Sequence, residues 1–66
     1  MQVAKTIELS SESPESFEDA IRQGIVKASQ TLHGISGIYV KEQLATVSDN
    51  QVQNFRVHMQ ITFALD

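Results

Sequence analysis

The feature that most constrains the fold is a strict alternation near the end of the chain, NFRVHMQITFAL at residues 54–65. Every second residue is apolar, and the residues between them are mostly polar: Phe55, Val57, Met59, Ile61, Phe63 and Leu65 alternate with Asn54, Arg56, His58, Gln60 and Thr62. This period of two predicts a long β-strand with one face on a core. The environment of the polar face is then the main question.

The chain is short for a self-supporting core. At 66 residues it is expected to form a single domain, residues 1–66, and to be marginally stable alone. Small folds usually need a disulfide, a metal or a partner subunit. The absence of cysteine excludes disulfides and thiolate zinc sites, so self-association is the remaining common stabiliser.

Charge and hydropathy exclude two classes of partner. A net charge of -3 with only five Lys and Arg residues argues against nucleic-acid binding, which needs clustered basic side chains. Neither a signal peptide nor an apolar run of membrane length is recognised, so we expect no membrane contact and a cytoplasmic location.

The first half of the chain predicts a strand and a helix. Residues 3–9 form the expected strand, with alternate residues on one face. Ser13 is the predicted helix N-cap and Pro14 its first position. The helix should run to about Leu32, with Gly34 as the C-terminal cap.

The apolar stripe of this helix contains a glycine. It is formed by Phe17, Ile21, Gly24, Ile25, Ala28 and Leu32. Gly24 costs the helix about 1 kcal/mol relative to Ala, which predicts close approach of helix and sheet there. Val26 lies off the stripe and is either an isolated exposed residue or a subunit contact.

Two further strands, about 37–48 and 51–65, should form an antiparallel hairpin around the turn Asp49-Asn50. The numbers of opposed residues then sum to 99. This register puts three pairs on the core side: Ile38 with Ile61, Val40 with Met59, and Leu44 with Phe55. The predicted fold is α+β, in the order β-α-β-β. Its three-stranded antiparallel sheet has the strand order 1-3-2 and curves around one helix.

The second face, which we define as the sheet face away from the helix, should carry the polar side chains. The predicted pairs are Gly37 with Thr62, Tyr39 with Gln60, Lys41 with His58, Gln43 with Arg56, and Ala45 with Asn54. This face is either solvated or covered by neighbouring copies, because a long hairpin edge invites pairing. The same register places Glu42 on the core side opposite Val57. Glu42 would then serve as a structural ion pair, an inter-subunit contact or a catalytic acid.

No catalytic constellation is recognised, so we expect no enzymatic activity. His33 follows the helix, and His58 lies near Lys41 and Arg56, a poor setting for a divalent metal. The serines at 10, 11, 13 and 16 indicate a turn and capping cluster without a histidine base. The enzymatic alternative would use Glu42, His58 and Arg56.

Three segments in their order and spacing resemble the dodecins: K-x-x-E-L at 5–9, S-P-x-S-x-E-D-A-I at 13–21, and A-S-x-T-L at 28–32. The resemblance covers nearly the whole chain. It implies a hollow sphere of twelve copies, with a total charge of 12 × (-3) = -36. Burial between copies would also stabilise the thin core.

The flavin-binding residues of typical dodecins are replaced. The family's stacking Trp corresponds to Gly37, and its ring-binding Gln corresponds to Arg56. Gly37 offers no ring for stacking, and Arg56 has donors without an acceptor. The resemblance therefore implies pocket-equivalent positions at Gly37, Tyr39, Gln43 and Arg56, with flavin binding altered or lost.

The segment VKEQLATV at 40–47 is more similar to the group called calcium dodecins. Calcium or another cation is therefore a second candidate ligand, although no metal ligands are assigned. The resulting interpretation is a non-enzymatic homododecameric cage that stores or sequesters a small molecule or ion. The alternative is a riboflavin- or FMN-binding dodecin with a variant pocket.

Overall fold

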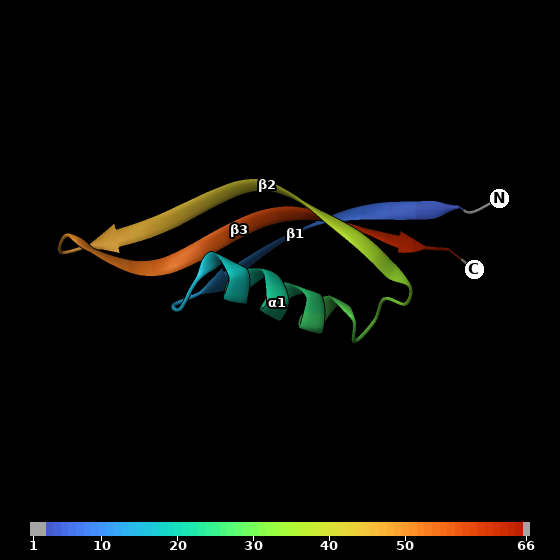
Figure 1. The fold of residues 1–66 in the computed structure, drawn as a ribbon, viewed down its shortest axis with the longest axis horizontal. Coiled ribbons are helices and arrows are strands. Elements are labelled where there is room, and N and C mark those ends of the chain that lie inside the picture. Colours follow the sequence, from blue (N-terminus) through green and yellow to red (C-terminus); the bar gives the residue numbers. More distant parts are fainter. Residues whose placement is uncertain (1–2, 66) are drawn as a thin grey trace.

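A computed structural model describes residues 3–65 as one strand, one helix and a long hairpin. The elements are β1 (Ala4–Ser13), α1 (Phe17–Ala28), β2 (Ile35–Ser48) and β3 (Gln51–Ala64). The sheet is antiparallel throughout, with β3 between β1 and β2. Helix α1 lies along one face of this sheet (Figure 1). The predicted α+β class and the strand order 1-3-2 are confirmed.

The start of α1 differs from the prediction. The N-cap is Ser16, whose side chain accepts a hydrogen bond from the Asp19 N–H at 2.9 Å. Ser13 instead ends β1, and its buried hydroxyl donates to the Asp19 carboxylate at 2.6 Å and accepts from the Glu15 N–H at 3.0 Å. The Ser13 cap prediction was wrong because β1 continues past Leu9 and delays the helix by one turn.

The end of α1 also differs. The helix ends at Ala28 with Ser29 as its cap, and a short turn precedes β2. Gly34 has a φ of +69°, and its carbonyl accepts the Ala64 N–H at 3.0 Å. The left-handed conformation expected at Gly34 is present, but it serves the entry into β2 and not the helix terminus.

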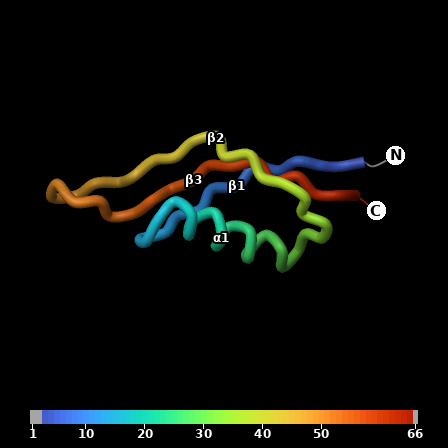
Figure 2. The backbone as a smooth tube through the Cα atoms, in the orientation of Figure 1, coloured from blue at the N-terminus to red at the C-terminus, as the bar shows by residue number. Residues whose placement is uncertain are grey.

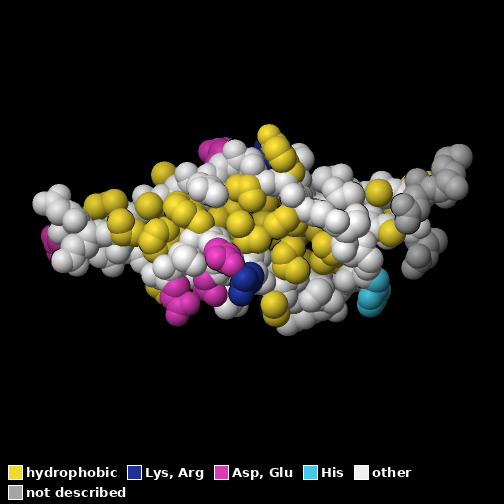
Figure 3. Space-filling view, in the orientation of Figure 1, with side chains coloured by type: hydrophobic (Ala, Val, Ile, Leu, Met, Phe, Trp, Pro, Cys, Tyr) yellow, Lys and Arg dark blue, Asp and Glu magenta, His cyan; other side chains and the backbone are white. Residues whose placement is uncertain are grey.

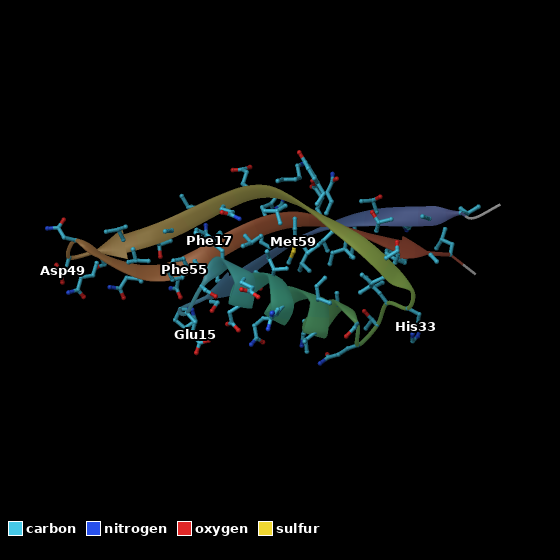
Figure 4. The ribbon with its side chains drawn as sticks, in the orientation of Figure 1. Glu15, Phe17, His33, Asp49, Phe55 and Met59 are labelled. Carbon is cyan, nitrogen blue, oxygen red and sulfur yellow. The ribbon has the colours of Figure 1, made fainter. Side chains whose placement is uncertain are left out.

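The core lies between α1 and the central strand. Its buried apolar residues are Ala20, Val57, Met59, Ile61 and Phe63. Phe17 meets Phe55 edge to face at a centroid distance of 5.0 Å, and Figure 4 shows both beside the helix start. A Cβ at Gly24 would overlap the Met59 side chain, which confirms the close approach predicted there.

The hairpin confirms part of the predicted register. Asp49 and Asn50 both have positive φ, as a two-residue type I′ turn requires. The pairs Ile38 with Ile61 and Val40 with Met59 are also as predicted.

Two bulges change the register between those pairs and the turn. One lies between Val40 and Glu42, and the other lies between Thr46 and Val47. Each bulge adds one unpaired residue and shifts the ladder by one position. Leu44 consequently lies opposite Arg56 and Glu42 opposite His58, so both predicted core pairings were wrong.

The chain is elongated and leaves much apolar surface exposed. It measures 51 × 20 × 13 Å, and its radius of gyration of 13.6 Å exceeds the roughly 11 Å of a compact chain of this length. The tip of the β2–β3 hairpin extends beyond α1 (Figure 2), and a band of apolar side chains runs from it toward the helix (Figure 3). The exposed large apolar residues are Val3, Val26, Ile38, Tyr39, Leu44, Val47, Val52 and Leu65.

Across residues 3–65, the structure contains no helix that is both long enough and apolar enough to cross a membrane.

Candidate functional site

The second face is built from rows of three residues, one from each strand. In the order β1, β3, β2, the rows are Glu8–Gln60–Tyr39, Ser10–His58–Glu42 and Glu12–Arg56–Leu44. The predicted pairs Gly37 with Thr62 and Tyr39 with Gln60 are confirmed. The predicted pairings of Lys41, Gln43 and Ala45 were wrong. The bulge leaves Lys41 without an opposed residue and moves the residues after it to the opposite face of the sheet. Gln43 now lies opposite Val57, on the α1 side.

Ion pairs on this face connect β1 to each of the other two strands. Lys41 Nζ lies 2.7 Å from Glu8 Oε1, so it links β2 to β1 across the central strand. Both Nε and Nη2 of Arg56 lie 2.6 Å from Glu12 Oε1. These contacts satisfy the two permanent cations of the face with carboxylates from the same chain.

The Lys41–Glu8 contact perturbs both proton equilibria. The hydrogen bond from Lys41 and its positive charge lower the pKa of Glu8 below 4.5. The same hydrogen bond and the charge of Glu8 raise the pKa of Lys41 above 10.5. A lowered Glu8 pKa stabilises the fold above pH 4.5, and this contribution is lost as the pH falls through the folded value. The Lys41 contribution is complete below pH 10.5 and is lost as the pH rises through its folded value.

We expect Lys41→Met to lower the thermal midpoint at pH 7 by a small amount, because the pair is partly exposed to solvent. The difference from the wild type should shrink at pH 3, because the Glu8 contribution is progressively lost as the pH falls below 4.5 toward its lowered pKa. Thermal unfolding at both pH values, at a fixed protein concentration, measures this change. Lys27→Met is the matched control, because Lys27 lies in the last turn of α1. A difference that is equal at pH 3 and pH 7 would contradict a role for the Glu8 charge.

The middle row brings a serine and a histidine together. Ser10 Oγ lies 2.9 Å from His58 Nδ1, and His58 Nε2 lies 3.8 Å from Glu8 Oε1. The sequence analysis missed this contact because it ended the first strand at Leu9. The connectivity resembles a nucleophile, base and acid, but 3.8 Å exceeds a hydrogen bond and Glu8 is already bonded to Lys41. The geometry therefore favours a surface polar network over a nucleophilic centre.

A shallow depression of about 260 Å³ opens beside this network. It is lined by Ser10, Glu42, Leu44, Arg56 and His58. Among the residues described, Glu42 is the acidic group of this lining without an ion-pair partner. The depression therefore combines the Glu42 carboxylate with the polar side chains of Ser10, Arg56 and His58, and Leu44 forms its apolar wall.

The predicted site residues are not brought together within one chain. Gly37 pairs with Thr62 and Arg56 pairs with Leu44, which places them six positions apart along β3. At about 3.4 Å per residue this is roughly 20 Å. Tyr39 lies between them and is 66% exposed. A ligand shorter than this distance cannot contact both the Gly37 and the Arg56 positions of the same chain.

The sequence analysis missed Ser10 and Leu44 as lining residues of the depression. A longer β1 was readable from the sequence, because Glu8, Ser10 and Glu12 continue the polar alternation of that strand. Nothing in the alternation of β2 indicated the bulge that exposes Leu44.

The structure contains no preformed metal site within residues 3–65, where no three His, Asp or Glu side chains are grouped to hold an ion. His33 lies in the loop after α1, and Figure 4 shows it far from Asp49 along the long axis of the molecule.

The fold and the polar second face define a class of small β-α-β-β protein, and comparison with known proteins identifies its family. The dodecin family model matches residues 3–66, and the chain belongs to the dodecin family. A dodecin of Thermus thermophilus is 31% identical over 65 residues, which is 98% of this chain and 94% of that protein.

Solved dodecin structures superpose closely on this chain. A dodecin from Streptomyces davaonensis has a TM-score of 0.93 with 35% identity, covering 98% of this chain and 96% of that one. The calcium dodecin of Mycobacterium tuberculosis, described as a calcium-chelating antigen with a novel calcium-binding site, has a TM-score of 0.84 with 25% identity. The superposition covers 97% of this chain and 91% of the calcium dodecin chain.

Proposed function

We propose that this protein is a non-enzymatic, cytoplasmic storage or sequestration protein that assembles as a homododecameric cage, and that its flavin pocket is altered or lost. The observation that carries the proposal is the pair of replacements on the second face, Gly37 and Arg56. Each fails in a different way to provide a flavin contact.

The Gly37 position is empty space. A Cβ built there meets no atom within 4 Å, so the chain provides no surface for a ring to stack on. An aromatic stack contributes about 0.5–1.5 kcal/mol beyond the burial of its area, and both contributions are missing. Tyr39 is the nearest exposed ring along the strand, and it supports the alternative of a variant flavin pocket.

The charge of Arg56 is already paired with a carboxylate of its own chain. Its guanidinium is held by Glu12 through two contacts of 2.6 Å. It offers no acceptor to a ligand, and its free donors lie next to a carboxylate. This pairing also reduces its attraction for phosphate or carboxylate ligands.

Assembly is supported by what a single chain leaves exposed. The elongated shape, the apolar band and the free outer edge of β2 all require cover that one chain does not supply. The roughly 20 Å between the Gly37 and Arg56 positions also supports a pocket shared between copies.

Cation binding fits the charge of this face better than anion binding. The rows and the bulge carry three carboxylates, Glu8, Glu12 and Glu42, against the cations Lys41 and Arg56. Calcium prefers six to eight oxygen ligands, more than one chain gathers here. A cation site of this cage would therefore combine carboxylates from several copies.

The first test is the native mass of the purified protein together with its absorbance from 300 to 550 nm. Twelve copies of 7.3 kDa give a mass of about 88 kDa. A dodecamer without flavin bands is the expected result. A dodecamer with bound flavin would favour the variant pocket, and a monomer would overturn the cage.

A further inference from the structure

Of the three register shifts in the β2–β3 hairpin, the two nearer the turn cancel each other. Val40 opposite Met59 and Val47 opposite Val52 belong to one continuous register, because both pairs of residue numbers sum to 99. Between them the ladder is displaced by one position, and Leu44 opposite Arg56 is an example. The displaced segment, residues 42–46, could therefore rejoin the continuous register without any change elsewhere in the hairpin.

Apolar burial favours that continuous register. Leu44 is 53% exposed in the structure, where it faces the depression. In the continuous register it would lie opposite Phe55 instead, beside the Phe17–Phe55 aromatic pair. The observed arrangement thus gives up an apolar contact that the sequence offers.

Charge favours the observed register. In the continuous register Lys41 would lie directly opposite His58, with Arg56 two positions along the same face, and Glu42 would turn to the α1 side opposite Val57. Val57 is fully buried, and a carboxylate placed against it without a partner incurs a large desolvation cost. The bulge avoids this cost, because it puts Glu42 opposite His58 on the second face, where Lys41 also bonds Glu8.

We propose that Glu42 selects the register of residues 42–46, and that its carboxylate is what keeps this segment bulged. Glu42 is then a positioning residue for the second face. Its loss moves Leu44 to the α1 side and removes two of the five residues that line the depression. This inference concerns the chain itself and does not rest on the proposed storage function.

Disulfide trapping reports the register directly, because the chain has no cysteine of its own. In the observed register Thr46 lies opposite Asn54, whereas the continuous register puts Ala45 there. The two double variants Thr46→Cys/Asn54→Cys and Ala45→Cys/Asn54→Cys therefore trap the bulged and the continuous register, respectively. Only side chains on the same face reach the 3.5–4.5 Å Cβ separation that a disulfide needs. Mass spectrometry of the denatured protein separates bonds within a chain from bonds between copies.

With Glu42 present, the 46–54 bond should form in preference to the 45–54 bond. Adding Glu42→Leu should lower the ratio of the two by up to about fivefold, the scale of one cross-strand pair. Glu18→Leu, which adds the same side chain on an exposed turn of α1, should leave the ratio unchanged.

Two further substitutions at the same position keep the test decisive. Glu42→Gln removes only the charge and should shift the ratio in the same direction, and it replaces Glu42→Leu if that variant does not fold. Glu42→Asp keeps the charge and should preserve the 46–54 bond. An unchanged ratio in folded Glu42→Gln and Glu42→Leu would overturn the proposal.

Discussion

Gly37→Trp combined with Arg56→Gln should give this protein a flavin affinity at least about tenfold above that of the wild type. A side chain can begin at this position without a clash within the chain, because no atom lies within 4 Å of a Cβ at Gly37. The amide of a glutamine supplies both a donor and an acceptor where Arg56 supplies donors alone. Quenching of riboflavin fluorescence on titration with the assembled protein measures the gain.

The two single variants are the controls for this experiment. Gly37→Trp alone should restore most of the stacking, and Arg56→Gln alone should restore little, since a hydrogen bond without a stacked ring leaves the flavin exposed to water. Val26→Trp places the same ring on an exposed part of α1 and should give no quenching. If the assembled double variant binds flavin no better than the wild type, the pocket is not where the family resemblance places it.

Substitution at position 56 also releases Glu12, and this affects how the result is interpreted. In the wild type that carboxylate is held by Arg56. Without the cation it adds negative charge to the face, which opposes binding of FMN more than that of uncharged riboflavin. A larger gain for riboflavin than for FMN would therefore support the pairing seen in the structure.

The central strand was predictable because its constraint is strong. Val57, Met59 and Ile61 are fully buried, and each of their neighbours faces the polar side, so a shift of one residue would bury a charge. The close approach at Gly24 was predictable for a related reason, because an interior glycine in an apolar helical stripe needs a packing explanation. Both inferences rest on a single element and its own pattern.

The features that were missed depend on contacts between elements. Ser13 and Ser16 are both suitable N-caps, and the choice depends on β1 continuing along β3 as far as the pair Ser13 with Phe55. The bulge after Val40 brings Glu42 opposite His58 of β3 and Lys41 to Glu8 of β1, and no local pattern of β2 contains these partners. The predicted burial of Glu42 failed for this reason, since one extra residue exchanges the faces of all residues up to the next bulge.

The missed bulge and the missed length of β1 both determine which residues line the depression. Leu44 and Glu42 line the depression only because of the bulge, and Ser10 does so only because β1 is long. The family resemblance supplied the positions Gly37 and Arg56, but it did not show that one chain holds them about 20 Å apart. The depression is therefore a property of strand pairing more than of any short motif.

Gly24→Ala should destabilise the wild type but stabilise a variant in which Met59 is shortened to Ala. In the wild type the added methyl overlaps the Met59 side chain and lies 3.3 Å from Ser11 Cβ. Overpacking of this kind costs about 1–3 kcal/mol, against a gain of about 1 kcal/mol in helix propensity. Met59→Ala alone should cost about 2–5 kcal/mol, because Met59 is fully buried.

In the double variant the new methyl enters space that Met59 has vacated, so the helix gain of about 1 kcal/mol remains without the overlap. Urea unfolding of all four proteins, at one fixed protein concentration, gives the coupling free energy of the two sites. Gln23→Ala, on an exposed part of α1, is the matched control and should be additive with Met59→Ala to within about 0.5 kcal/mol. Additivity at Gly24 as well would show that the helix does not depend on this close contact, and the packing account of the glycine would be wrong.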